Sequence, residues 1–320
     1  MGMRGLFKAA VGALATSALS GALALSAAAE DLVGEPTDKA MGWQPAASEF
    51  KVKVETFYDG LLFWTITAIC VLVLGLLAWI VIRYNKKANP VPAKFSHNTL
   101  IEIIWTVVPV GILVVIAVYS VTLLKYQNDM PTPDVVVKAT GNQWYWTYDY
   151  PELGVTDVES RLLPAAQSLK TSDGVKVKYL LSTDNVLVVP VDKVVHVQTT
   201  ATDVIHAWTV PAFGIKMDAV PGRLNNTWFK ANKTGTFYGQ CSELCGKDHA
   251  YMPIEVKVVS QAEFDDYIVK SGGKTRAMLA AEEQAAAQAS AAAATTQSVS
   301  AEQASAVTAP AAASSASAAQ

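Results

Sequence analysis

The chain has 320 residues, of which 51% are hydrophobic and 17% are charged, and its formal net charge is −3 at pH 7. A chain of this length can hold two or three folding units, and the hydrophobic fraction is high for a protein that is soluble throughout. The near balance of acidic and basic residues excludes the strongly basic composition of many nucleic-acid-binding proteins. We therefore expect no nucleic-acid partner.

The first 29 residues have the pattern of a secretory signal peptide. Two basic residues, Arg4 and Lys8, precede an apolar stretch from Ala9 to Leu25 and then three alanines. This order predicts cleavage before Glu30 and export of the segment that follows. No cysteine lies near that position, which excludes a lipoprotein. We expect residues 30–60 to form an N-terminal segment on the periplasmic side of a membrane.

Residues 61–124 contain two apolar stretches that we interpret as a transmembrane hairpin. Leu61 to Ile82 and Ile103 to Leu124 carry no charged residue, and about 20 apolar residues suffice for a helix to cross a bilayer. The short connection from residue 83 to residue 98 contains four basic residues and no acidic one, namely Arg83, Lys86, Lys87 and Lys94. The positive-inside rule therefore predicts a cytoplasmic connection, with both flanking parts of the chain outside.

Residues 125–273 have the short, evenly spaced strands of an all-β domain. Alternating and β-branched segments, separated by Gly, Pro, Asn and Asp, predict a β-sandwich with Greek-key connections. The strands that we expect are 135–140, 176–181, 194–199, 227–230, 236–238 and 254–258. The pattern of residues 261–270 predicts one amphipathic helix at the end of the domain.

The C-terminal segment, residues 274–320, is dominated by Ala, Ser, Gln and Thr. So few large apolar side chains cannot form a core, which predicts a disordered tail. Because alanine favours helices, a transient helix is the alternative.

The chemistry of the domain is concentrated in residues 241–252, which read Cys-Ser-Glu-Leu-Cys-Gly-Lys-Asp-His-Ala-Tyr-Met. Two thiolates, an imidazole and a thioether form a soft ligand set that suits copper. Zinc accepts Cys and His, but a thioether is a poor zinc ligand. Blue copper sites use one Cys, whereas this loop has two, and two sulfurs four residues apart can bridge two coppers. A disulfide between the two cysteines is the alternative.

A binuclear copper site needs a second histidine from outside this loop. Three remain in the sequence: His97, His196 and His206. His97 follows the predicted cytoplasmic connection and therefore lies on the wrong side of the membrane. His206, in Asp-Val-Ile-His, is the best candidate, while alternation within its strand leaves His196 open.

The loop closely resembles the copper A loop of cytochrome c oxidase subunit 2. The resemblance extends from about Trp43 to Val259 and includes Gln-Trp-Tyr-Trp at 143–146 and the segment Val-Pro-Ala-Phe-Gly-Ile-Lys-Met-Asp-Ala-Val-Pro-Gly-Arg-Leu at 210–224. It implies a membrane-anchored all-β protein in which two N-terminal transmembrane helices precede a cupredoxin-like Greek-key β-sandwich.

The resemblance also implies a set of copper ligands. Cys241 and Cys245 would bridge the two coppers, and His206 and His249 would bind one copper each. Met252 would be the weak ligand of one copper. The backbone carbonyl of Glu243 would be the weak ligand of the other. Since the family motif includes Asp-Val-Ile-His, it favours His206 over His196, which we interpret as a structural residue.

Further roles follow from the same resemblance. Trp144 would receive electrons from cytochrome c, although tryptophans beside a membrane are more often packing residues. The carboxylate of Glu243 would help to hold a magnesium ion at the boundary with subunit 1. Glu102, at the cytoplasmic start of the second span, would admit protons, with a simple helix-terminal charge as the alternative. Asp203 and Asp218 would attract a basic cytochrome c.

The function that the resemblance implies is electron transfer within a haem–copper oxidase of a bacterial inner membrane. A multi-pass chain with its N-terminus and copper domain in the periplasm would accept electrons from cytochrome c and pass them to the haem of subunit 1. There oxygen would be reduced to water with proton pumping. Subunit 1, other oxidase subunits, cytochrome c and membrane lipid are the implied partners. A quinol oxidase subunit, nitrous oxide reductase and a copper carrier are the alternatives.

Overall fold

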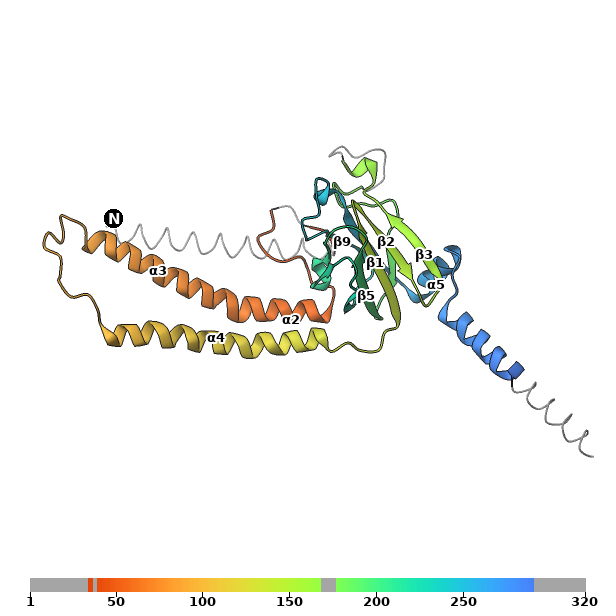
Figure 1. Ribbon diagram of the computed structural model, residues 1–320, viewed down its shortest axis with the longest axis horizontal. Coiled ribbons are helices and arrows are strands. Elements are labelled where there is room, and N and C mark those ends of the chain that lie inside the picture. Colours follow the sequence, from red (N-terminus) through yellow and green to blue (C-terminus); the bar gives the residue numbers. More distant parts are fainter. Residues whose placement is uncertain (1–33, 37–38, 168–176, 291–320) are drawn as a thin grey trace, which may run out of the picture.

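The computed structural model describes residues 34–36, 39–167 and 177–290. The predicted signal peptide and the last thirty or so residues lie outside this range. Two helical hairpin arms extend from one side of a β-sandwich, and a short C-terminal helix extends from the other side (Figure 1).

The first arm is a continuous helix of three parts: α2 (Glu49–Phe57), a π-helical turn η1 (Tyr58–Leu62) and α3 (Phe63–Arg83). The Ser48 side chain caps it by accepting a hydrogen bond from the backbone N–H of Lys51, as polar N-cap residues do. The second arm is α4 (Thr99–Asn128), capped in the same way by Asn98. Both stretches are long and apolar enough to cross a membrane, by length and composition alone.

The sandwich contains a five-stranded sheet of order β3-β2-β1-β5-β8, a three-stranded sheet of order β4-β10-β9 and a β6-β7 pair. Strand β1 runs parallel to β5, and β4 runs parallel to β10. The strands of the first sheet are β1 (Val135–Asn142), β2 (Tyr145–Tyr150), β3 (Val155–Ser160), β5 (Val194–Ala201) and β8 (Asn225–Lys230). The others are β4 (Leu187–Pro190), β6 (His206–Val210), β7 (Ile215–Ala219), β9 (Gly235–Gln240) and β10 (Pro253–Val259).

The core lies between the sheets because alternate residues of each strand point inward. Val135, Val137 and Ala139 of β1 are buried, and the intervening residues are half-buried. An aromatic stack fills the centre, where the rings of Phe213 and Phe229 lie 4.4 Å apart at 10°. The sandwich therefore gives its loops a rigid, fully packed base.

Five of the six predicted strands are confirmed, within β1, β5, β8, β9 and β10. The prediction of a strand over 176–181 is wrong, because residues 177–181 form a loop and a turn. The alternation of apolar and polar residues there belongs to a short, mostly half-buried segment that pairs with no strand. Strands β2, β3, β4, β6 and β7 are missing from the sequence analysis. Polar or aromatic residues interrupt the apolar alternation of β2, β3, β6 and β7, and β4 is a run of only four buried residues without alternation.

The predicted closing helix is confirmed as α5 (Gln261–Lys270), which begins with a capping box between Ser260 and Glu263. The prediction of disorder is wrong for residues 276–290, which are helical. An ion pair of 2.7 Å between Lys274 and Glu282 and one of 2.6 Å between Arg276 and Glu152 accompany this helix. Alanine-rich sequence favours a helix, and the pair with Glu152 joins this helix to the sandwich.

Candidate metal centre

The twelve-residue loop 241–252 connects β9 to β10 and is closed at its base. Gln240 and Pro253 are partners in the register of the two antiparallel strands. The backbone N–H of Ser242 also donates to the carbonyl of Ala207, at 3.1 Å. This bond joins the loop to β6, whose first residue is His206. Residues more than thirty positions apart are therefore brought to one site.

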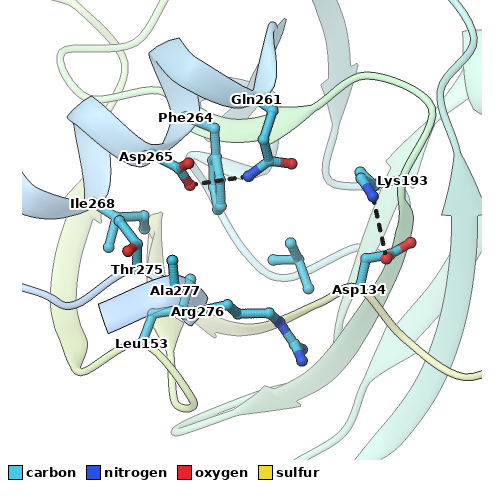
Figure 2. Close-up of a pocket in the computed structure, with 11 residues that line it drawn as sticks. Asp134, Leu153, Lys193, Gln261, Phe264, Asp265, Ile268, Thr275, Arg276 and Ala277 are labelled. Carbon is cyan, nitrogen blue, oxygen red and sulfur yellow. Dashed lines mark hydrogen bonds and ion pairs between the residues drawn. The ribbon is translucent and has the colours of Figure 1, made fainter. Parts of the chain in front are cut away.

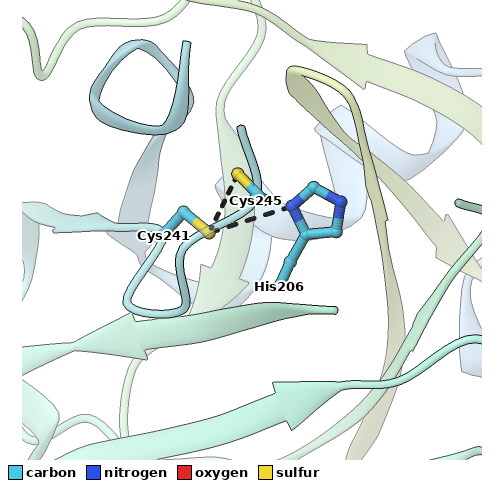
Figure 3. A group of neighbouring side chains, drawn as sticks. All are labelled: His206, Cys241 and Cys245. Atoms are coloured by element: carbon cyan, nitrogen blue, oxygen red, sulfur yellow. Dashed lines mark hydrogen bonds between the residues drawn. The ribbon is translucent and has the colours of Figure 1, made fainter. Parts of the chain in front are cut away.

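Two sulfur atoms form the middle of this site. The Sγ atoms of Cys241 and Cys245 are 3.9 Å apart, and both cysteines are free thiols rather than a disulfide. The Nδ1 atom of His206 lies 3.8 Å from Cys241 Sγ, and the Nδ1 atom of His249 lies 3.4 Å from Cys245 Sγ. Figure 3 shows His206 and the two thiols pointing toward one another.

Two weaker donors lie against the same sulfurs. The thioether of Met252 is 3.5 Å from Cys245 Sγ, and the backbone carbonyl of Glu243 is 3.3 Å from Cys241 Sγ. His206 is 0% exposed and Met252 is 1% exposed, whereas His249 is half-buried. A buried set of two thiols, two imidazoles and a thioether fits copper better than a hard cation.

The two thiols differ in acidity because their neighbours differ. Burial opposes ionisation of Cys241, but hydrogen bonds from His206 and from backbone N–H groups lower its pKa to about 7. Burial and the charge of Cys241 raise the pKa of Cys245. In the absence of a metal the pair favours one thiolate beside one thiol. A metal that both sulfurs bind must therefore release a proton.

Packing fixes the ring of His206. Trp146 of β2 meets it edge-on, with ring centroids 6.0 Å apart at 64°. Gly141 of β1, the partner of Trp146 in the strand register, also lies against the ring, where a Cβ atom would be 2.8 Å from His206 Cγ. A glycine is therefore required here for space. Trp146 is fully buried, in agreement with its predicted packing role.

Asp203 has a role that the sequence analysis missed. Because a carboxylate only accepts, His206 Nε2–H donates to Asp203 Oδ1 at 2.9 Å, and this contact turns Nδ1 of the same ring toward Cys241. The backbone N–H of Gln143 donates to Asp203 Oδ2 at 2.7 Å. Burial opposes ionisation of Asp203, but these hydrogen bonds lower its pKa. The signal in the sequence was that Asp203 lies three residues before His206. A carboxylate so close in the chain can accept from the ring of a histidine and orient it.

Trp144 lies in the two-residue turn between β1 and β2, not in a strand. Its indole Nε1–H donates to the backbone carbonyl of Cys245 at 3.2 Å, and the side-chain amide of Gln143 donates to the same carbonyl at 2.9 Å. At Gly246 a Cβ atom would lie 2.9 Å from the indole, so the ring rests directly on the copper loop. Two residues from one hairpin tip therefore bind the loop that carries both thiols.

The other side chains that the sequence analysis singled out do not contact the sulfur atoms. Glu243 and Asp218 have exposed side chains. Glu102 lies in the first turn of α4, at the end of the hairpin far from the sandwich (Figure 1). His196 points its Nε2 atom at the carbonyl of Pro131, 2.7 Å away, which agrees with the predicted structural role.

A separate cavity of about 260 Å³ lies beneath α5 (Figure 2). Its walls combine apolar side chains such as Phe264 and Ile268 with the ion pair of Lys193 and Asp134, whose atoms are 3.6 Å apart. Its lining includes no Cys, His or Met. Among the described residues, the group of His, Cys, Asp or Glu side chains close enough together to hold a metal ion is His206, Cys241 and Cys245.

Comparison with known proteins agrees with this geometry. The family model described as the periplasmic domain of cytochrome c oxidase subunit II matches residues 135–259, and that for the transmembrane domain matches residues 36–123. The chain belongs to the cytochrome c oxidase subunit 2 family. Its fold is accordingly two membrane helices followed by a cupredoxin-like β-sandwich.

Relatives match most of the chain. Cytochrome c oxidase subunit 2 of Cereibacter sphaeroides is 44% identical over 273 residues, which cover 80% of this chain and 90% of the relative. A probable cytochrome c oxidase subunit 2 of Rickettsia bellii is 47% identical over 234 residues, or 73% and 85% of the two chains. The crystal structure of the periplasmic domain of subunit II of cytochrome oxidase (CoxB) of Bradyrhizobium japonicum is 52% identical. It covers 45% of this chain and 96% of that chain, with a TM-score of 0.40.

Family membership makes this chain a membrane-bound subunit of a terminal oxidase. Its outer domain contains a copper centre, accepts electrons from cytochrome c and passes them to subunit 1. The alternatives of a quinol oxidase subunit, nitrous oxide reductase and a copper carrier are thereby set aside. The predicted oxidase function is confirmed.

Replacing Asp203 should disturb the copper centre. In Asp203→Ala the ring of His206 loses the acceptor at Nε2, and loss of such a partner typically costs about 10–100-fold in metal affinity or activity. We expect an altered visible and electron paramagnetic resonance spectrum and faster copper loss to a chelator. Asp218→Ala, which removes an exposed carboxylate, should retain the parent spectrum. An Asp203→Ala spectrum identical to the parent, with only a salt-sensitive loss of rate, would instead assign Asp203 to docking alone.

Proposed function

We propose that six residues of this chain hold a binuclear copper A centre: His206, Cys241, Glu243, Cys245, His249 and Met252. One observation carries the proposal, namely two free thiols 3.9 Å apart, each with an imidazole Nδ1 atom within 4 Å. In this assignment the two thiolates would hold both coppers, each imidazole would bind one copper, and the Met252 thioether and the Glu243 carbonyl would be weak ligands. When bound, the centre supplies one-electron storage shared between two metals.

The chain contributes rigidity and exclusion of water. Cys241, Cys245, Met252 and His206 are buried, and the loop is tied at its base to β10 and at Ser242 to β6. Ligands held in this way change position little when the charge of the site changes. Small reorganisation is what an electron relay requires.

The full chain should bind two coppers, because each thiol is flanked by its own imidazole. Cys241→Ser and Cys245→Ser should each abolish the mixed-valence spectrum of a binuclear centre, since a hydroxyl is a poor copper bridge. The matched control is His196→Ala, which removes a half-buried imidazole remote from the sulfurs and should leave the spectrum intact. Copper analysis with visible spectroscopy makes the measurement. One copper per chain, or the spectrum of a single blue site, contradicts the assignment.

We further propose that electrons reach the centre through Trp144. Its indole donates to the carbonyl of Cys245. One hydrogen bond and the covalent bonds of Cys245 therefore connect the ring with the sulfur of that residue. Lys247 Nζ lies 5.5 Å from the centre of the indole ring. The exposed carboxylate of Asp218 and the partly exposed one of Asp203 (29% exposed) would attract a basic cytochrome c, an effect exerted on association rate.

Trp144→Phe should slow electron transfer from cytochrome c while copper content and cytochrome c affinity stay close to the parent values. The phenyl ring retains apolar contact but loses the hydrogen bond to Cys245. Trp43→Phe, at an exposed tryptophan remote from the loop, is the matched control and should transfer electrons at the parent rate. Stopped-flow reduction by cytochrome c measures both. A Trp144→Phe variant as fast as the control would place electron uptake elsewhere.

The orientation that we propose puts the sandwich in the periplasm and the basic connection 84–98 in the cytoplasm of a bacterial inner membrane. The basic connection and the two apolar helices support it. The exposed carboxylate of Glu243, between the two thiols, is available to hold magnesium at the boundary with subunit 1. Subunit 1, further oxidase subunits, cytochrome c and lipid are the partners in this proposal.

Glu102 lies at the opposite end of α4, where we propose that it admits protons to subunit 1. The helix has 30 residues, about 45 Å at about 1.5 Å per residue, so the carboxylate is at the cytoplasmic face in this orientation. Its charge also suits the positive end of the helix.

Glu102→Gln should slow oxygen turnover of the assembled oxidase without loss of copper or of cytochrome c binding. Loss of a helix-terminal charge destabilises by only about 0.3–1 kcal/mol, too little to prevent assembly. Reduction of the haem–copper centre in the purified variant, followed by stopped flow, separates slow proton uptake from poor assembly. Glu55→Gln, at the outer end of the first arm, serves as control. If the haem–copper centre is reduced at the same rate in both variants, Glu102 has no role in proton uptake and is only a charge at the membrane boundary.

A further inference from the structure

The outer end of the helical hairpin contains three neighbouring hollows that share lining residues. A junction cavity of about 490 Å³ lies where the two arms meet the sandwich, and Tyr126 belongs both to it and to a groove of about 860 Å³ between the arms. Leu61 and Val115 are shared between this groove and a deeper one of about 500 Å³. The three hollows thus follow one another along the chain, from the sandwich to the membrane-spanning part, and we call this series the path.

The junction cavity combines aromatic faces with charges of both signs. Tyr126 stacks on Phe50, with ring centroids 6.1 Å apart, and meets Trp228 at 5.7 Å. Carboxylates of Glu49 and Asp192 also line it. Aromatic faces together with carboxylates attract an ammonium group.

Cations lie beside the same cavity. Lys230 lines it, and Lys53 lines the adjoining groove, with its Nζ atom 2.9 Å from Glu49 and 4.9 Å from the centre of the Tyr126 ring. An ammonium side chain attracts phosphate. Two carboxylates and two lysines around one aromatic cavity complement a headgroup that has one positive and one negative charge.

The grooves are apolar and run along the hairpin. From Val52 to Ile69 they follow about 17 residues of the first arm, which is about 25 Å at 1.5 Å per residue. The path is longer than half of a hydrocarbon core of about 30 Å, and therefore long enough for an acyl chain. At Gly60 and Gly111, which line the two grooves, a Cβ atom would meet nothing within 4 Å. The space beside both glycines is open.

We propose that this path binds one zwitterionic phospholipid of the outer leaflet, with its headgroup in the junction cavity and an acyl chain in the grooves. The charges around the cavity fit a zwitterionic headgroup. A polar cavity next to apolar grooves fits a lipid better than it fits a helix that is apolar along its whole length. The site is separate from the copper ligands, none of which lines the three hollows. It does not depend on the assignment of those ligands.

Photo-cross-linking in the assembled oxidase tests the acyl-chain site. The oxidase is reconstituted into vesicles with phosphatidylethanolamine that carries a diazirine on its acyl chain, irradiated and digested for mass spectrometry. We expect labels concentrated in residues 52–69 and 108–126. Gly60→Leu and Gly111→Leu each fill the groove with a side chain and should lose this labelling. Gly75→Leu, a third helical glycine with open space around it that lines none of the three hollows, should retain it.

The outcomes separate a lipid site from other occupants. Labelling spread evenly along both arms, or unchanged by both groove substitutions, overturns the proposal. If the lipid probe does not label the groove residues, and these residues instead cross-link to a helix of a partner subunit, the proposal is overturned and the grooves are a protein interface. Copper content is measured in each variant as a check on assembly, and either groove variant that assembles suffices.

Competition tests the headgroup. Unlabelled phosphatidylethanolamine should displace the probe more effectively than phosphatidylglycerol, whose headgroup is anionic and has no ammonium. In Glu49→Gln this preference should diminish, because a carboxylate that faces the ammonium is lost. Lys233→Gln, which changes a lysine outside the three hollows, should keep the preference. Equal displacement by both lipids in the parent enzyme overturns the assignment of a zwitterionic headgroup.

Discussion

The structure depends on two sulfur atoms being held side by side within a closed loop. Cys241 and Cys245 are four residues apart, and their Sγ atoms are 3.9 Å apart because the loop folds back between β9 and β10. Burial and the charge of the neighbouring Cys241 both raise the pKa of Cys245, so ionising both thiols is unfavourable in the absence of a metal. A metal cation that binds both thiolates neutralises this charge, so metal binding is favoured. The rigid sandwich matters because it keeps this unfavourable arrangement in place before the metal binds.

A second layer of hydrogen bonds joins the metal site to the hairpin tip at Gln143 and Trp144. Asp203 accepts from His206 and from the backbone of Gln143, while the side chains of Gln143 and Trp144 donate to Cys245. Each buried group in this layer has a partner, and such networks are rigid when they are complete. The hairpin tip at which we propose that electrons enter is therefore joined to the metal site by direct hydrogen bonds.

The sandwich is joined to the membrane hairpin through both arms. The Ser48 hydroxyl donates to the carbonyl of Phe213 at 2.7 Å, which joins the first arm to the sandwich. The Gln127 side chain at the end of α4 donates to Thr227 at 2.9 Å, and the indole of Trp228 donates back to the carbonyl of Gln127 at 3.0 Å. Two such attachments fix the orientation of the copper loop relative to the membrane, which electron transfer into a membrane-embedded partner requires. The junction cavity lies between these attachments, so a bound lipid would fill the space that they leave.

The sequence by itself determined the features that depend on local pattern. Hydropathy located both membrane helices, alternation located β1, β5, β8, β9 and β10, and residue types in the loop indicated soft-metal chemistry. It could not locate β6 or β7, whose burial comes from packing on neighbouring strands, nor the helix over 276–290, which contacts Glu152 across the fold. Only the tertiary structure decided that His206 turns Nδ1 toward Cys241, that Asp203 orients it, and that Trp144 lies in a turn against Cys245. The physical reason is that ligand type and spacing are properties of adjacent residues, whereas the orientation of a side chain is set by partners that are distant in the chain.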